Sequence, residues 1–253
     1  MLAALLPTGM EPWVAALLVV ASCFTSAITA VFGMGGGIAM LALMGLFVPV
    51  ASLIPVHGAV QLGSNTGRAW HQRAFVRMDI AKPFIAGSVV GAILGVFLVV
   101  QLPDALLKLV LGGFILLLTW AKIPGIDRLS KAGLAVASVV AALLSMLVGT
   151  TGPLVAVLLA RFLDNDRKAL IATSAVAMTA QHFLKIIVFG VAGFAFWEWM
   201  PLIAAMIVSG FIGTRYGTSL LERMPEATFR KWFSIGITVL ALDLVRRGMM
   251  AFV

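Results

Sequence analysis

The sequence predicts an all-α, polytopic membrane protein made of two inverted-topology repeats of about five helical segments each. Two observations lead to this prediction. First, 62% of the 253 residues are hydrophobic and 11% are charged, whereas an average soluble domain is about 25% charged. Second, ten apolar runs follow one another, and a short run after a glycine cluster occurs at the same place in each set of five.

The ten apolar runs account for most of the chain. Those of the first set cover 13–32, 38–50, 54–70, 83–101 and 105–121. Those of the second set cover 132–149, 153–163, 168–192, 198–218 and 227–247. Most of them approach the roughly 20 residues that a helix needs to span a bilayer. We therefore expect one transmembrane repeat within residues 1–125 and a second within residues 126–253.

The runs 38–50 and 153–163 are too short for a comfortable crossing, and we expect half-helices or short tilted spans there. The first follows the cluster Gly33 to Gly37, and the second follows a related break that starts at Gly149, 116 residues after Gly33. Broken helices persist at membrane depth only where protein or a watery cavity satisfies the freed backbone. A helix N-terminus there favours anions. Two such breaks in matching positions are typical of a secondary transporter.

A further match between the repeats lies in their fourth segments, where Gly91 corresponds to Gly213 at an offset of 122. Basic loops of membrane proteins face the cytoplasm, and the basic loops of this chain indicate five crossings per repeat with both termini outside. Because five is odd, the loop 102–104 is expected outside and its partner 222–226 inside. The second repeat is therefore predicted to be inverted relative to the first.

Composition and motifs exclude several classes of function. The net charge of +8 comes from basic residues at the ends of apolar runs, so it does not indicate nucleic-acid binding. The single cysteine, Cys23, excludes an internal disulfide and provides no metal cluster. No Gly-x-Ser-x-Gly, His-Glu-x-x-His or Cys-x-x-Cys pattern is present. We expect no enzyme activity, cofactor or metal site, and a retained N-terminus because residues 1–12 lack a basic signal-peptide start.

The segment 54–70 carries a polar face within an apolar surrounding. His57, Gln61, Ser64 and Arg68 lie on one side of the predicted helix, and Asn65 borders them. Polar groups are costly in lipid unless they face the interior of the bundle. Two alternatives stay open: Arg68 could extend to the membrane interface, and His57 could form a hydrogen bond between helices.

The segment 168–192 repeats this face. Ser174, Gln181 and Lys185 lie at the same phase, Met178 takes the second polar position, and His182 borders the face. Lys185 lies well inside its apolar run, which favours an interior role. The acidic residues, by contrast, fall in or near loops or close to a segment end. A deep polar set that is neutral or basic, together with two helix N-termini, favours an anionic substrate.

These features predict a binding site for a small anion. Backbone N–H groups at the starts of the two short helices, amide and hydroxyl side chains, and two basic side chains would hold it. The predicted site residues are Gly35, Gly36, Gly37, Ile38, His57, Gln61, Asn65, Arg68, Thr150, Thr151, Gly152, Gln181, His182 and Lys185. The expected partners are this substrate and the lipid bilayer, nucleic acid is not expected, and assembly of several copies is left open.

Three stretches of the chain resemble the TauE/SafE sulfite exporter family. They are Phe32-Gly33-Met34-Gly35-Gly36-Gly37, Val56-His57-Gly58-Ala59-Val60-Gln61-Leu62-Gly63-Ser64-Asn65 and Gly149-Thr150-Thr151-Gly152-Pro153-Leu154. The resemblance covers nearly the whole chain. It implies a multi-pass protein of a bacterial inner membrane that exports sulfite or a small organosulfonate. A passive anion channel with the same lining and a membrane-embedded enzyme are the alternatives.

Overall fold

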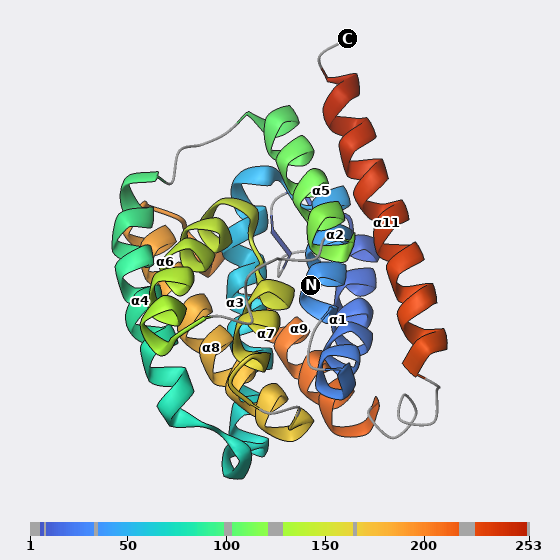
Figure 1. Cartoon of the computed structure of the whole chain (residues 1–253). Helices are drawn as coiled ribbons and strands as arrows, with labels where there is room; N and C mark the ends of the chain where they lie inside the picture. Colours follow the sequence, from blue (N-terminus) through green and yellow to red (C-terminus); the bar gives the residue numbers. More distant parts are fainter. Residues whose placement is uncertain are drawn as a thin grey trace.

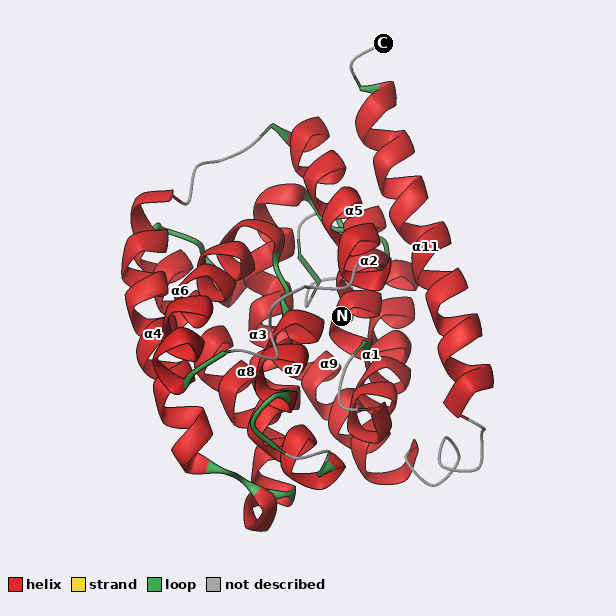
Figure 2. Ribbon diagram, in the orientation of Figure 1, coloured by secondary structure: helices red, strands yellow, loops and turns green. Residues whose placement is uncertain are grey.

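The computed structural model describes residues 6–7, 9–32, 35–98, 103–120, 129–163, 166–217 and 226–251. Within these ranges the chain consists of helices joined by short connections and contains no strand (Figure 2). The predicted all-α fold is confirmed.

Each predicted apolar run corresponds to one helix. The first five are α1 (Pro12–Phe32), α2 (Gly36–Phe47), α3 (Val50–His71), α4 (Met78–Leu98) and α5 (Asp104–Trp120). The next five are α6 (Lys131–Val148), α7 (Gly152–Ala160), α8 (Arg167–Val191), α9 (Met200–Ile212) and α11 (Glu226–Met250). Short 3₁₀ turns, η2 (Arg73–Phe75) and η4 (Phe196–Trp199), precede α4 and α9, and a π turn, η5 (Gly213–Gly217), extends α9.

Among the helix starts, the largest difference from the prediction is at α4, which begins at Met78 rather than at residue 83. Its first turn contains Asp79, which binds Arg77 and Lys131. An acidic side chain is favourable at a helix N-terminus. A prediction based on apolar runs misses this turn because Asp79 and Lys82 interrupt the run.

Five helical segments of the described residues are long and apolar enough to cross a membrane: Pro12–Phe32, Met78–Phe97, Lys131–Val148, Arg167–Val191 and Phe196–Tyr216. The two short helices, α2 and α7, have 12 and 9 residues. At 1.5 Å per residue they measure about 18 Å and about 14 Å, well short of a hydrocarbon core of about 30 Å. Neither can cross alone, which agrees with the prediction of half-helices.

Large apolar side chains are exposed on several outer helices. Examples are Val20 on α1, Phe97 on α4, Val136 on α6, Phe211 on α9 and Val239 on α11. Water would make so many exposed apolar groups unfavourable, whereas lipid does not. The chain is a multi-pass membrane protein.

The two halves pack against each other reciprocally. Helix α4 packs on α6, while α1 packs on α9 and η5, and α3 packs on α8 near the centre (Figure 1). Gly91 of α4 leaves no room for a Cβ against the backbone of Val139 in α6, and Gly213 leaves none against the backbone of Cys23 in α1. Gly213 follows Gly91 by 122 residues, and Val139 follows Cys23 by 116, the same offsets that relate the repeats. The contact between Gly91 and Val139 is therefore equivalent to the contact between Gly213 and Cys23, with the roles of the two halves exchanged.

Equivalent junctions of the two halves lie at opposite ends of the molecule. The end of α4 and the start of α5 are at the upper end of Figure 1, whereas η5 and the start of α11 are at the lower end. Inverted repeats require this placement. The two-fold operation itself, and the division into residues 1–125 and 126–253, stay predictions.

Candidate functional site

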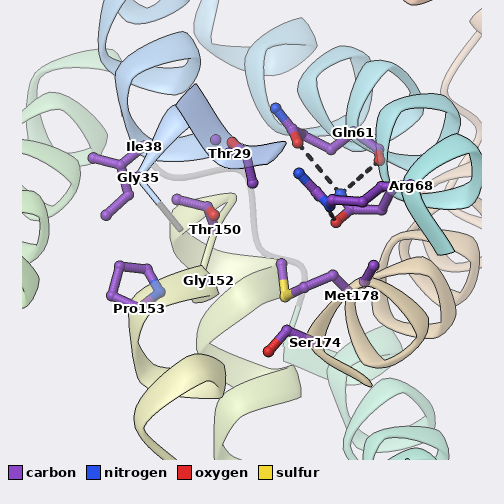
Figure 3. A pocket seen from close by; sticks show the side chains of 13 residues that line it. Thr29, Gly35, Ile38, Gln61, Arg68, Thr150, Gly152, Pro153, Ser174 and Met178 are labelled. Atoms are coloured by element: carbon purple, nitrogen blue, oxygen red, sulfur yellow. Dashed lines mark hydrogen bonds between the residues drawn. The ribbon is translucent and has the colours of Figure 1, made fainter. Parts of the chain in front are cut away.

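A pocket lies where the starts of α2 and α7 meet the polar faces of α3 and α8. Figure 3 shows Gln61 and Arg68 on one side of it, Gly152 and Pro153 on another, and Ser174 and Met178 on a third. The residues that line it are Thr29, Gly35, Gly37, Ile38, Gln61, Asn65, Arg68, Thr150, Gly152, Pro153, Ser174, Ala175 and Met178.

The starts of α2 and α7 present backbone N–H groups without a side-chain cap. Gly35 precedes α2 with φ 99°, a conformation that favours glycine, and Thr151 precedes α7; neither position has a side-chain capping hydrogen bond. The first intrahelical bonds run from Ala39 N–H to the Gly35 carbonyl and from Val155 N–H to the Thr151 carbonyl. The N–H groups before Ala39 and Val155 need partners outside their helices.

On α3 a chain of hydrogen bonds holds Arg68 against the pocket. Asn65 Nδ2 donates to the Gln61 carbonyl oxygen at 2.7 Å and to Gln61 Oε1 at 3.4 Å. Arg68 Nη2 donates to Asn65 Oδ1 at 2.5 Å (Figure 3). Because Arg68 is only 3% exposed, its side chain turns inward and does not extend to the interface.

The charge of Arg68 has no acidic partner among the described residues, and its Nη1 has no hydrogen-bond partner there. The acidic members of the ion pairs among the described residues are Asp79 and Asp243, and both are at least partly exposed. Ser174 Oγ, another pocket atom, is also buried without a partner among the described residues. A buried cation is costly unless it is paired, so the pocket favours an anion.

The glycines of the first motif have different surroundings. A Cβ on Gly37 would lie 3.6 Å from Gln61 and from Thr150 Oγ1, which is ordinary contact. A Cβ on Gly36 would overlap the Thr25 carbonyl and Thr29 Oγ1 of α1. Gly37 therefore faces the pocket, whereas Gly36 allows α1 and α2 to approach each other.

Several predicted site residues lie outside the pocket lining, in the protein interior beside it. His57 Nε2 is 2.9 Å from the Gly37 carbonyl oxygen, and the His57 and His182 rings are 6.1 Å apart. Lys185 Nζ donates to the Gly149 carbonyl oxygen at 2.5 Å. All three side chains are fully buried.

Thr151 and Gln181 form a further contact outside the lining. The Thr151 hydroxyl donates to Gln181 Oε1 at 3.2 Å, and Gln181 Nε2 donates to Ser88 Oγ at 3.4 Å. The Thr151 hydroxyl is therefore bound to another side chain.

The predicted residues divide into two groups. Those in the pocket lining are Gly35, Gly37, Ile38, Gln61, Asn65, Arg68, Thr150 and Gly152. Those outside it are Gly36, His57, Thr151, Gln181, His182 and Lys185. The prediction omitted Thr29, Pro153, Ser174, Ala175 and Met178 from the site. Ser174 and Met178 were recognised on the polar face of α8, but no sequence pattern showed that Thr29 of α1 reaches the pocket.

Comparison with known families gives one match that covers nearly the whole chain. A sequence model of the family "Sulfite exporter TauE/SafE" matches residues 18–244, which include both glycine motifs, α3 and α8. Neither a comparison with curated proteins nor one with solved structures found a match. Because this match covers residues 18–244, the chain belongs to the TauE/SafE sulfite exporter family.

Proposed function

We propose that the chain is a secondary transporter that exports a small sulfur-containing anion, sulfite or an organosulfonate, across a bacterial inner membrane. Membership of the TauE/SafE family supports the transporter class. The observation that carries the proposal is Arg68, a buried cation that lines the pocket without an acidic partner in the described part of the chain.

The donors around the pocket suit a sulfur oxyanion. A guanidinium group binds planar pairs of anionic oxygens through parallel N–H donors. Arg68 has Nη1 available for this, while Nη2 is anchored on Asn65. The starts of α2 and α7 add N–H groups from two further directions.

Part of the lining is apolar. Ile38, Pro153 and Met178 form this part of the wall. It contacts sulfur or a short carbon chain without requiring hydrogen bonds, and such a mixture of apolar wall and few convergent polar groups is typical of small-molecule sites. It is compatible with both sulfite and an organosulfonate.

A carrier fits the packing better than a channel does. Beside the pocket, His57, Thr151, His182 and Lys185 are fully buried and lie outside its lining. A passive channel needs a continuous watery path, whereas a carrier has one side closed at a time.

The test is transport by purified protein in proteoliposomes supplied with sulfite, sulfate, sulfoacetate or taurine. We expect saturable sulfite or sulfonate flux that accelerates when the same anion is present on the far side. Arg68→Ala should abolish it, and Arg73→Ala, which removes an exposed arginine just after α3, should not. Non-saturable flux without exchange acceleration would indicate the channel, and no anion flux at all would contradict transport.

A further inference from the structure

Several polar residues that line the pocket have equivalents in the opposite half of the chain. Thr29 of α1 corresponds to Ser145 of α6, at the offset of 116 that relates the glycine motifs. On the central helices the offset is 117, and it relates Arg68 to Lys185 and Asn65 to His182. The first member of each pair lines the pocket, and the second does not.

The same relation holds in the reverse direction. Ser174 of α8 lines the pocket, and its equivalent on α3, 117 residues earlier, is His57, which does not. Gln61 and Met178, which are equivalents of each other, both line the pocket. Four polar residues of the pocket therefore have equivalents in the opposite half of the chain that do not line it. These equivalents are Ser145, His57, His182 and Lys185. We call these four residues the mate cluster.

The two sets of residues share an unusual property. Seven buried side-chain atoms lack a hydrogen-bond partner among the described residues. Arg68 Nη1 and Ser174 Oγ belong to the pocket, and Ser145 Oγ, His57 Nδ1 and both ring nitrogens of His182 belong to the mate cluster. The remaining one is Gln72 Oε1. Buried polar atoms without partners are costly, so their concentration in both sets indicates two places where a polar ligand binds.

His57, His182 and Lys185 of the mate cluster lie close together, and Lys185 is its basic residue. The His57 and His182 rings are 6.1 Å apart, and Lys185 lies one helical turn from His182. The Lys185 stem packs over Gly58, where an added Cβ would lie 2.8 Å from Lys185 Cδ. Lys185 has no acidic partner among the described residues, and its ammonium group instead donates to the Gly149 carbonyl at the end of α6.

We propose that Ser145, His57, His182 and Lys185 form a second anion subsite, closed in this structure, that receives the anion when the pocket closes. This inference rests on the proposed function. The ammonium group of Lys185 leaves the Gly149 carbonyl and binds the anion, as Arg68 does in the pocket. The hydroxyl of Ser145 and one imidazole N–H of His182 supply the remaining donors, while His57 Nε2 donates to the Gly37 carbonyl beside them.

Sided cysteine labelling tests the arrangement in the transporting protein. Thr29→Cys and Ser145→Cys are equivalent positions, and each is made in a Cys23→Ala background. A membrane-impermeant sulfonate thiol reagent should modify Thr29→Cys from one side of the membrane and Ser145→Cys from the other. Modification of both variants from the same side of the membrane would overturn the second subsite. So would modification of Thr29→Cys alone when both variants still transport the anion.

Separation of binding from transport gives an independent test. Lys185→Met keeps the stem over Gly58 but removes the charge. We expect sulfite binding to the detergent-purified protein within about twofold of wild type, because the pocket with Arg68 is intact, while proteoliposome flux falls at least about tenfold. Lys185→Arg, which places the pocket's own cation in the mate cluster, should restore part of the flux.

Three results separate the possible failures. Unchanged flux in Lys185→Met would overturn the second subsite and leave the proposed function standing. Equal loss of sulfite binding in Lys185→Met and Arg68→Met would indicate one shared site instead of two. A wild-type protein that neither binds nor carries an anion would overturn the proposed function, and the second subsite with it.

Discussion

Lys185 Nζ donates a hydrogen bond to the carbonyl oxygen of Gly149, 2.5 Å away, at the point where α6 ends. Carbonyl groups at a helix C-terminus carry partial negative charge and favour a cation. Gly149 has φ 85° there, a conformation that favours glycine and closes the helix. The contact stabilises the ammonium group of Lys185, which has no acidic partner among the described residues.

Removal of the pocket cation should weaken anion binding without weakening the fold. In Arg68→Met we expect sulfite affinity to fall about 10- to 100-fold, because one charge-assisted contact is lost. Thermal stability without anion should be unchanged or higher, because no acidic partner is left unpaired and an ion no longer has to be buried. Isothermal titration and a thermal melt in detergent check the two parts, with Arg73→Met as the control. An Arg68→Met protein that melts well below wild type would contradict this account of Arg68.

Neighbouring glycines of the first motif should respond differently to alanine. Gly36→Ala should lower the free energy of unfolding by about 1–3 kcal/mol, because its Cβ overlaps α1 and forces the helices apart. Gly37→Ala should leave stability nearly unchanged, because its Cβ meets only ordinary contacts, and should instead reduce sulfite affinity by narrowing the pocket. Thermal melts and binding isotherms for both variants check this. The prediction is wrong if Gly37→Ala is the less stable of the two.

Reciprocal packing of the halves predicts similar losses at two distant positions. Gly91→Ala and Gly213→Ala should both lower the melting temperature, because each added Cβ meets the backbone of the facing helix. Gly113 of α5 has nothing within 4 Å of an added Cβ. Gly113→Ala should therefore stabilise the protein by about 0.5–1 kcal/mol through helix propensity. Stability unchanged in either packing variant would show that the two contacts are not equivalent.

Membrane topology can be tested at two described positions. The starts of α5 and α11 lie at opposite ends of the molecule (Figure 1). Pro103, just before α5, and Lys231, in the first turns of α11, are both exposed. An impermeant thiol reagent should modify Pro103→Cys only from outside intact cells and Lys231→Cys only after the cytoplasmic side is opened. Both positions reacting from one side would contradict inverted repeats.

Much of the fold could be predicted from the sequence because its signals are local. Apolar runs and glycine breaks located the ten helices of the described residues, including the two short ones. The helical spacing of Gln61, Asn65 and Arg68 placed them on one face, and all three line the pocket. The start of α4 was missed, because the charged residues Asp79 and Lys82 interrupt the apolar run there.

By itself, the sequence determined the helices, the polar faces of α3 and α8, and the absence of acidic residues from those faces. Only the tertiary structure distinguished Arg68 from Lys185, since they occupy equivalent positions but only Arg68 lines the pocket. Likewise, only the approach of α1 separates the packing role of Gly36 from the pocket position of Gly37. The physical reason is that helical periodicity is encoded by neighbouring residues, whereas the partner of a buried group is set by the contacts between helices that are far apart in the chain.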